Sequence, residues 1–215
     1  VTLGVESNHH SIRNIDNVIG SQADDTIEGD LGNNTLDGNS GNDTISFQNS
    51  GAKVVVNIGD SDITISNAPT GNGTYTANQA TGTTIGTDKI INFENILSGS
   101  GDDTLIGSSG LNYIYGGLGN DFIYGGAGDD KLYGEEGNDT IVGGVGNDTI
   151  DGGEGIDTVS YFDASSVTLS LRGSSYGTAT ATYGGVSYND RLYSIENVIG
   201  SSGDDTIQGN EEDNV

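Results

Sequence analysis

The chain has 215 residues, including 37 glycines and a single proline, and only 32% of its residues are hydrophobic. Its 32 acidic residues stand against 6 basic ones, which gives a formal net charge of -26. This charge argues against nucleic acid and anionic membranes as partners and favours a multivalent cation. The chain has no cysteine, which excludes disulfides and thiolate zinc sites, and it has no apolar run near the ~18 residues that span a bilayer.

The first repeat along the chain occupies residues 12–46. An acid or an amide recurs every nine positions, at Asp16, Asp25, Asn34 and Asp43, and an aliphatic residue follows each of them two positions later. Residues 1–11 begin with VTLGVES and resemble the later stretch VTLSLRG. We expect 1–11 to be the end of a β-rich excursion and 12–46 to be a short roll of stacked repeats.

The nine-residue period stops after residue 46. In residues 47–87, apolar side chains alternate at Val54, Val56 and Ile58, and a stretch rich in Thr, Gly and Ser follows. Alternation with a period of two is typical of β-strands. We therefore predict a β-rich excursion of hairpins over 47–87 that caps or flanks the rolls.

The main repeat covers residues 88–160. Each nine-residue unit has a glycine-rich half that suits a tight turn and a short stretch of β-forming residues around one aliphatic residue. The register begins at Glu94, in a unit that keeps the acid and the aliphatic residue but lacks the glycines. The later sixth-position residues are Asp103, Asn112, Asp121, Asp130, Asp139, Asp148 and Asp157.

One such unit cannot bury its aliphatic side chain alone. Two units should therefore form an 18-residue coil with facing aliphatics, and successive coils should stack ~4.8 Å apart. Residues 18 apart then lie above one another, so Asp121 stacks on Asp139 along one edge and Asp130 on Asp148 along the other. Because carboxylates this close repel one another, the stack requires a cation.

A second excursion is expected over 161–189, where Val167, Leu169 and Leu171 alternate. Residues 190–215 return to the acid-and-aliphatic register at Glu196 and Asp205. We expect them to start a further, truncated roll. The whole chain is then expected to be a segment of a longer protein.

Units such as GGLGNDFIY and GGAGDDKLY fit the pattern GGxGxDxUx, where U is a large aliphatic residue. This pattern resembles the RTX (repeats-in-toxin, or hemolysin-type) calcium-binding repeat. The resemblance implies an all-β fold: a parallel β-roll, which is a right-handed β-solenoid of 18 residues per coil, interrupted by β-hairpin excursions. It also implies several bound Ca2+ ions, a bacterial source and type I secretion, with folding outside the cell.

For the ion sites, the resemblance implies that each ion takes the sixth-position Asp of two stacked loops. It adds backbone carbonyls from positions one and three of one loop and two and four of the next. The side-chain ligands would be Asp25, Asp43, Asp103, Asp121, Asp130, Asp139, Asp148, Asp157 and Asp205. The carbonyl ligands would be those of Gly116, Leu118, Gly125, Ala127, Gly134, Glu135, Glu136, Gly137, Gly144, Gly146, Gly153 and Gly155.

Two stacked pairs place an amide beside an acid, namely Asp16 with Asn34 and Glu94 with Asn112. Asparagine keeps an oxygen but lacks the charge, so either a weaker metal site or a metal-free hydrogen bond is compatible with these pairs. We favour the hydrogen bond, as a cap on the roll.

An outward-facing aromatic set is a candidate binding face for glycans or a surface protein. Tyr113, Tyr115 and Tyr133 should share one sheet face, and Phe122 and Tyr124 the other. The alternative is that these rings reflect β-propensity and are covered by an excursion hairpin.

No catalytic constellation is evident, so we expect no enzyme activity. Ser175 lies in a G-x-S-x-G match, but the two histidines, His9 and His10, lie far upstream and no strand-turn-helix pattern surrounds the serine. We expect a calcium-binding segment that serves a structural or adhesive role, as in an adhesin, in a large secreted or bacterial cell-surface protein. The alternative is the noncatalytic carboxy-terminal module of a secreted hydrolase or polysaccharide-modifying enzyme.

Overall fold

In the computed structural model the chain folds into two long β-sheets and a small hairpin. The structure describes residues 16–66, 70–171, 176–210 and 214. Residues 1–11, with His9 and His10, and Ser175 of the G-x-S-x-G match lie outside the described residues. Among the described residues no helix is long and apolar enough to cross a membrane.

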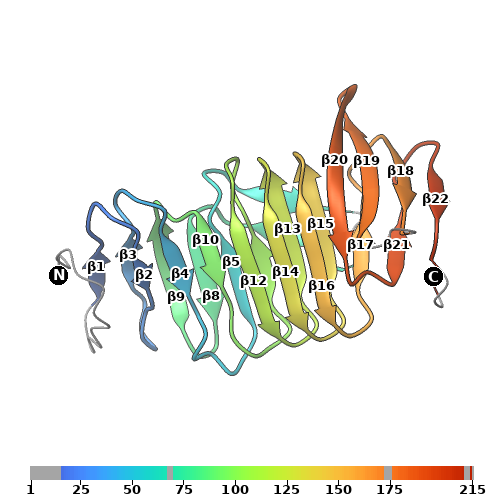
Figure 1. Cartoon of the computed structure of the whole chain (residues 1–215). Helices are drawn as coiled ribbons and strands as arrows, with labels where there is room; N and C mark the ends of the chain where they lie inside the picture. The colour runs from blue at the N-terminus through green and yellow to red at the C-terminus, as the bar shows by residue number, and fades with distance from the viewer. Residues whose placement is uncertain (1–15, 67–69, 172–175, 211–213, 215) are drawn as a thin grey trace.

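Strands from alternate half-coils form each sheet, and the coils follow one another along the length of the molecule (Figure 1). The first sheet has the order β1 (Asn17–Ile19), β3 (Thr35–Asp37), β9 (Gly86–Ile91), β8 (Gln79–Gly82), β5 (Val54–Asn57), β11 (Thr104–Ile106), β13 (Phe122–Ala127), β15 (Thr140–Val145), β17 (Thr158–Ser160) and β21 (Asn197–Ile199). The second sheet has the order β2 (Thr26–Ile27), β4 (Thr44–Ser46), β10 (Asn95–Leu97), β12 (Tyr113–Leu118), β14 (Lys131–Glu136), β16 (Thr149–Glu154), β20 (Val186–Tyr193), β19 (Gly177–Tyr183), β18 (Ser166–Ser170) and β22 (Thr206–Gln208). The separate hairpin pairs β6 (Ile63–Ile65) with β7 (Gly73–Tyr75).

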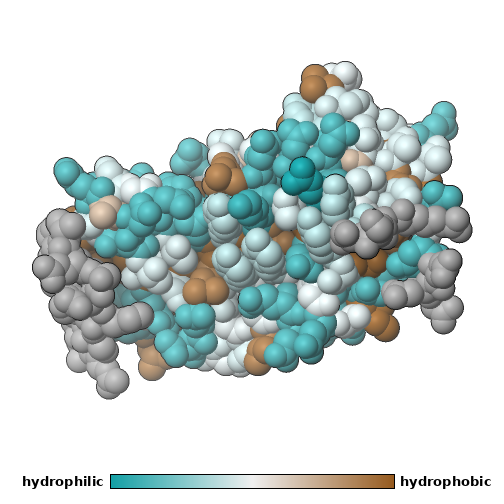
Figure 2. All heavy atoms as spheres, viewed as in Figure 1, coloured by the Kyte–Doolittle hydropathy of each residue, from teal (hydrophilic) through white to brown (hydrophobic). Residues whose placement is uncertain are grey.

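The repeat region forms the expected parallel β-roll. Ile114 of β12 pairs with Leu132 of β14, and Ile123 of β13 pairs with Ile141 of β15, so each coil has 18 residues. The inward aliphatic side chains of the main repeat, from Ile96 to Val159, have no exposed surface and form one continuous core between the sheets, whereas Ile207 of β22 is 45% exposed. Hydrophilic side chains dominate the surface visible in Figure 2, which follows from burying one apolar residue in each unit.

The central strands are longer than the short β-forming stretch of each repeat unit. β12 to β16 each run for six residues, into the glycine-rich half of the next unit. The reason is that the loop backbones also pair between coils: Leu118 donates its amide hydrogen to Gly99 O at 2.9 Å, and Gly119 donates to Glu136 O at 2.9 Å. The loops at the edges are therefore ordered by hydrogen bonds of their own.

Both excursions add strands to the sheets. From 47–87, β5 pairs in parallel with β11, and β8 runs antiparallel between β5 and β9 within the first sheet. From 161–193, β18, β19 and β20 extend the second sheet in the same way, and β19 and β20 are joined by the positive-φ pair Gly184 and Gly185. The domain limits given above for the rolls and excursions stay a prediction.

Candidate metal sites

The sixth-position residues form two ladders, one along each edge of the roll. In the first ladder, which precedes the strands of the first sheet, the amides of Asp103, Asp121 and Asp139 each donate to Oδ1 of the acid 18 residues later, at 2.7, 2.8 and 2.8 Å. In the second ladder, Asn112 donates to Asp130, and Asp130 to Asp148, at 2.8 Å each. One oxygen of each carboxylate therefore holds the preceding coil in register.

The other oxygen of these carboxylates has no partner. Oδ2 is buried and without a hydrogen bond in Asp121, Asp139 and Asp157 of the first ladder and in Asp130 and Asp148 of the second. The side chains of all five are at most 2% exposed. A buried, unpaired carboxylate oxygen is costly unless a cation or a donor satisfies it. The structure thus leaves an unsatisfied carboxylate oxygen at each of these five positions.

Glycine at position one makes the space into which this oxygen points. A side-chain carbon on Gly116 would lie 2.5 Å from Asp121 Oδ2 and 2.6 Å from the carbonyl oxygen of Gly134, in the next coil. A carbon on Gly125 would lie 2.6 Å from Asp130 Oδ2 and 2.5 Å from Gly143 O. The carboxylate oxygen and a backbone carbonyl oxygen therefore border the same small space, and any side chain there would fill it.

The other expected carbonyl ligands lie in the same edge loops. Leu118 O accepts a hydrogen bond from the Gly101 amide at 2.8 Å, and Glu136 O accepts one from Gly119, which leaves each carbonyl a second lone pair. Glu135 occupies a second position that is glycine in the other units of residues 116–160, and it adopts a positive φ of 77°. The other predicted carbonyl ligands lie at positions one to four of the neighbouring loops, namely Gly125, Ala127, Gly134, Gly137, Gly144, Gly146, Gly153 and Gly155.

Burial and mutual repulsion raise the proton affinity of the ladder carboxylates. Burial raises the pKa of Asp121 to about 7, with a further rise from the charges of Asp103 and Asp139, against a lowering by the Asp103 amide. Burial likewise raises the pKa of Asp130 to about 8 and that of Asp148 to about 7. Without a cation, the folded roll thus favours protonated aspartates near neutral pH.

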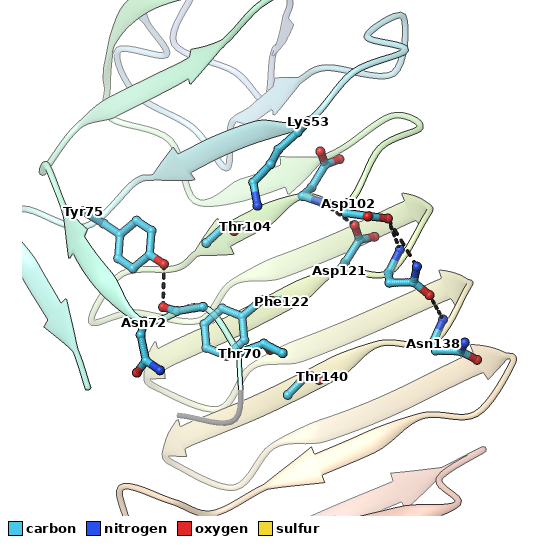
Figure 3. A pocket seen from close by; sticks show the side chains of 13 residues that line it. Lys53, Thr70, Asn72, Tyr75, Asp102, Thr104, Asp121, Phe122, Asn138 and Thr140 are labelled. Carbon is cyan, nitrogen blue, oxygen red and sulfur yellow. Dashed lines mark hydrogen bonds between the residues drawn. The ribbon is translucent and has the colours of Figure 1, made fainter. Parts of the chain in front are cut away.

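Position five of the repeat forms a further series of hydrogen bonds, outside the two ladders of sixth-position residues. The amides of Asn120, Asn138 and Ile156 each donate to the side-chain oxygen 18 residues earlier, at 2.8, 2.9 and 2.8 Å. These bonds point in the opposite direction from those of the aspartate ladder. Figure 3 shows this outer series beside Asp121, at a pocket of about 280 Å³ that residues 70–72 and Tyr75 of β7 also line. The recurrent Asn-Asp pair could have indicated it.

Three sixth-position aspartates and Asn112 differ because a serine satisfies the side-chain oxygen that is open at the other positions. The Ser98 hydroxyl donates to Asp103 Oδ2. Asp25 Oδ2 accepts from the amide and hydroxyl of Ser21 at 2.5 and 3.0 Å. The single side-chain oxygen of Asn112 accepts from the Ser108 amide at 2.7 Å. Asp205 Oδ2 accepts from the Ser201 amide at 2.8 Å, and Asp205 Oδ1 accepts from the Ser201 hydroxyl at 2.6 Å. These positions, at the starts of the rolls, are closed by the protein itself.

Two buried acids of the ladders were missed by the sequence analysis, namely Asp88 and Asp190. Asp88 Oδ1 accepts from the Asn34 amide at 2.9 Å, and Asp190 Oδ1 from the Asp148 amide at 2.9 Å. Asp88 Oδ2 has no partner, whereas Asp190 Oδ2 accepts from the Tyr161 hydroxyl at 2.9 Å. Each acid is followed two positions later by an aliphatic residue, and this signal could have found both.

The amide pairs differ in detail from the expected side-chain contacts. Asn112 Nδ2 donates to the backbone oxygen of Glu94 at 2.7 Å, and the Glu94 carboxylate instead accepts from the amide of Asp43 at 2.7 Å. The backbone amide of Asn34 donates to Asp88 Oδ1.

The aromatic set divides as expected between the two sheets. Tyr115 and Tyr133 stack in the second sheet, with ring centroids 4.8 Å apart and planes 6° apart, and Lys131 Nζ lies 4.8 Å above the Tyr113 ring. Phe122, however, is only 3% exposed because it packs with Ile65 of β6, Ile106 and Val142, and Tyr124 packs at the margin of that cluster. Phe122 is therefore covered by the excursion and is removed from the candidate binding face.

The ladder residues fit a hard divalent cation. Carboxylate and carbonyl oxygens are the ligands that Ca2+ prefers, and each open step offers an unsatisfied carboxylate oxygen beside a carbonyl. Among the described residues no three His, Cys, Asp or Glu side chains converge on one point, so backbone oxygens would have to complete each site.

Comparison with protein families decides the matter. The model of the RTX calcium-binding nonapeptide repeat matches four copies, at residues 14–45, 97–132, 124–159 and 185–215, and these copies cover more than half of the chain. The chain belongs to the RTX calcium-binding repeat family. RTX nonapeptide repeats bind calcium ions, so the chain is a calcium-binding module for several ions. No curated protein matches the chain.

Proposed function

We propose that this RTX segment folds when it binds calcium outside the cell. The observation that carries the proposal is the series of buried carboxylate oxygens without partners in a chain of net charge -26. Each such oxygen opposes folding until a cation satisfies it. If free calcium is tenfold above the dissociation constant, each site contributes ~1.4 kcal/mol, and five sites contribute about as much as the stability of a whole domain.

The proposed ions lie at the open steps of both ladders. On the first edge Asp121, Asp139 and Asp157 would supply side-chain oxygens, and on the second edge Asp130 and Asp148 would do so. Asp25, Asp103 and Asp205 would serve as the serine-closed ends of the ladders.

Far-UV circular dichroism during a calcium titration, with a chelator control and a magnesium control, tests the proposal. We expect a disordered spectrum in chelator and a cooperative gain of β-structure with calcium at about 10⁻⁴ to 10⁻³ M, the usual range for extracellular calcium modules. A β-spectrum that persists in chelator contradicts calcium-driven folding. A midpoint below about 10⁻⁶ M contradicts folding that is confined to the extracellular space.

We further propose that the segment has a structural or adhesive role, without catalysis, in a large secreted or surface protein that is exported by type I secretion. Stacking that continues through both excursions along one axis supports a stalk-like role. The neighbouring protein sequence distinguishes this role from that of a noncatalytic module of a hydrolase. Further rolls and excursions would favour the stalk, and a catalytic motif would favour the hydrolase.

For adhesion, the stacked pair of Tyr115 and Tyr133 is the proposed contact surface for a glycan or a surface protein. A glycan array probed in calcium tests the glycan arm with Tyr115→Ala and Tyr133→Ala, and Tyr188→Ala on the β19–β20 hairpin serves as the control. Calcium-dependent binding that only the first two variants lose is expected. Absence of any hit, or equal loss in all three variants, contradicts glycan recognition by this pair.

A further inference from the structure

The chain returns from each excursion to the roll through the same short turn. The two turns have the sequences DKIINFENIL (residues 88–97) and DRLYSIENVI (residues 190–199). In each, an acid lies within the last strand of the excursion, Asp88 in β9 and Asp190 in β20, and a glutamate follows six positions later instead of nine. Asn92 and Ser194 occupy the same place in the two turns and adopt positive φ values of 55° and 50°. We call these segments the re-entry turns.

The re-entry turns make identical contacts with the roll, on opposite edges. Glu94 Oε2 accepts from the amide of Asp43 at 2.7 Å, and Glu196 Oε2 accepts from the amide of Asp157 at 2.8 Å. The backbone amides of Glu94 and Glu196 in turn donate to the carbonyl oxygens of the same aspartates, at 3.1 and 3.2 Å. Each glutamate therefore takes the place that an aspartate 18 residues later takes in the regular ladder.

Each contact leaves an unsatisfied, buried carboxylate oxygen. Asp43 is 1% exposed and Asp157 is 0% exposed, and Oδ2 of each has no partner. These oxygens point into the same kind of space as in the regular repeats. A side-chain carbon on Gly38 would lie 2.7 Å from Asp43 Oδ2, and one on Gly152 would lie 2.5 Å from Asp157 Oδ2.

The re-entry turn itself supplies the carbonyl that borders this space. A side-chain carbon on Gly38 would meet the carbonyl oxygen of Asn92. A side-chain carbon on Gly152 would likewise meet the carbonyl oxygen of Ser194. In the regular repeat a position-one glycine, such as Gly134 opposite Gly116, provides the equivalent oxygen. The positive φ of Asn92 and Ser194 therefore accompanies a carbonyl that takes this place in a turn three residues shorter than the repeat.

We propose that each re-entry turn completes a calcium site with the roll, formed by Asp43, Asn92 O and Glu94 at the first excursion and by Asp157, Ser194 O and Glu196 at the second. This inference rests on the proposed function and extends it, because neither glutamate nor either turn carbonyl belongs to a GGxGxDxUx unit. Two carboxylates and a carbonyl match the oxygen preference of calcium. These two ions join segments 51 and 39 residues apart and hold each excursion against the roll.

Hydrogen exchange of the full chain with and without calcium tests the proposal on Glu94→Gln and Glu196→Gln. Glutamine keeps an oxygen that can accept from the aspartate amide and removes only the charge. Glu154→Gln is the matched control, since Glu154 is an exposed acid in the loop that precedes Asp157.

In the wild type we expect calcium to slow exchange at least tenfold at residues 92–97 and 194–199. Glu94→Gln should lose this effect at 92–97 alone, Glu196→Gln at 194–199 alone, and Glu154→Gln at neither. Native mass spectrometry should count one calcium ion fewer in each of the first two variants.

Wild-type calcium counts and exchange rates in both glutamine variants overturn the inference. If either variant does not fold, the wild type decides, because calcium protection of 116–155 without protection of the two re-entry turns also overturns it. A wild type that gains no structure with calcium defeats the proposed function itself, and the two failures are thereby distinguished.

Discussion

The amide of Asp121 donates to Oδ1 of Asp139, while Oδ2 of Asp139 has no partner. One carboxylate therefore links two coils and also offers an oxygen to an ion. Asp139 stands between two proposed ions, since Asp157 repeats the relationship one coil further on. Asp25 differs because Ser21 satisfies its second oxygen.

Asp139→Ala should consequently destabilise the calcium-bound chain more than Asp25→Ala does. Loss of two ions at tenfold excess calcium costs about 3 kcal/mol, against at most ~1.4 kcal/mol for one ion. For a chain of this size, 3 kcal/mol lowers the melting temperature by roughly 6–12 °C. Thermal unfolding in calcium measures both variants, and equal shifts would contradict the difference between open and serine-closed positions.

A methyl group at position one should block an ion site. Gly116→Ala places a carbon against Asp121 Oδ2 and Gly134 O, so we expect one ion fewer and a calcium midpoint raised severalfold. Gly110→Ala is the control, because its nearest neighbour would be 3.9 Å away. Native mass spectrometry and the calcium titration measure the two effects. An unchanged ion count in Gly116→Ala would argue that the ions lie elsewhere.

Removal of the Ser98 hydroxyl should create a new calcium site at Asp103. Ser98→Gly frees Asp103 Oδ2 and restores the glycine that stands at position one in the regular repeats. We expect this variant to bind one ion more than the wild type. Ser98→Ala, which removes the hydroxyl but keeps a side-chain carbon in the space, should bind the same number as the wild type. A count that does not rise in Ser98→Gly would show that serine closure is not what keeps this step free of metal.

Protonation of the buried carboxylates should partly replace calcium in stabilising the folded chain. Burial raises the pKa of Asp139 to about 6, Asp121 to about 7 and Asp130 to about 8, from an ordinary value of 3.8. With raised folded-state values, the folded chain binds more protons than the unfolded chain between about pH 4 and pH 8, so apo stability is lost as the pH rises through that window.

In chelator we therefore expect more β-structure at about pH 5 than at about pH 8. In calcium, protons compete for the same oxygens, so the calcium midpoint should rise as the pH falls. Circular dichroism at several pH values measures both trends. Apo β-structure that increases with pH would contradict the assignment of the buried carboxylates.

The coil length, the inward aliphatics and the two stacked edges were predictable because they follow from a strict local period. Ile123 and Ile141 occupy the expected inward positions for this reason. The pairing of Asp43 with Glu94 was not predictable in this way, because it joins residues 51 positions apart and depends on how the excursion between them folds back. The burial of Phe122 likewise depends on where the β6–β7 hairpin packs against the first sheet, which no local sequence pattern determines.

The two excursions also act on the geometry of the stack in a compensating way. The first adds β8 and β9 between β3 and β5 of the first sheet alone, and the second adds β19 and β20 between β16 and β18 of the second sheet alone. Two strands added on one side only lengthen that side by roughly 10 Å and tilt the stacking axis. A matching insertion on the opposite side reverses the tilt, and each sheet of the described residues contains ten strands. Paired insertions of this kind allow both excursions to project from the roll while the stacking axis keeps its direction.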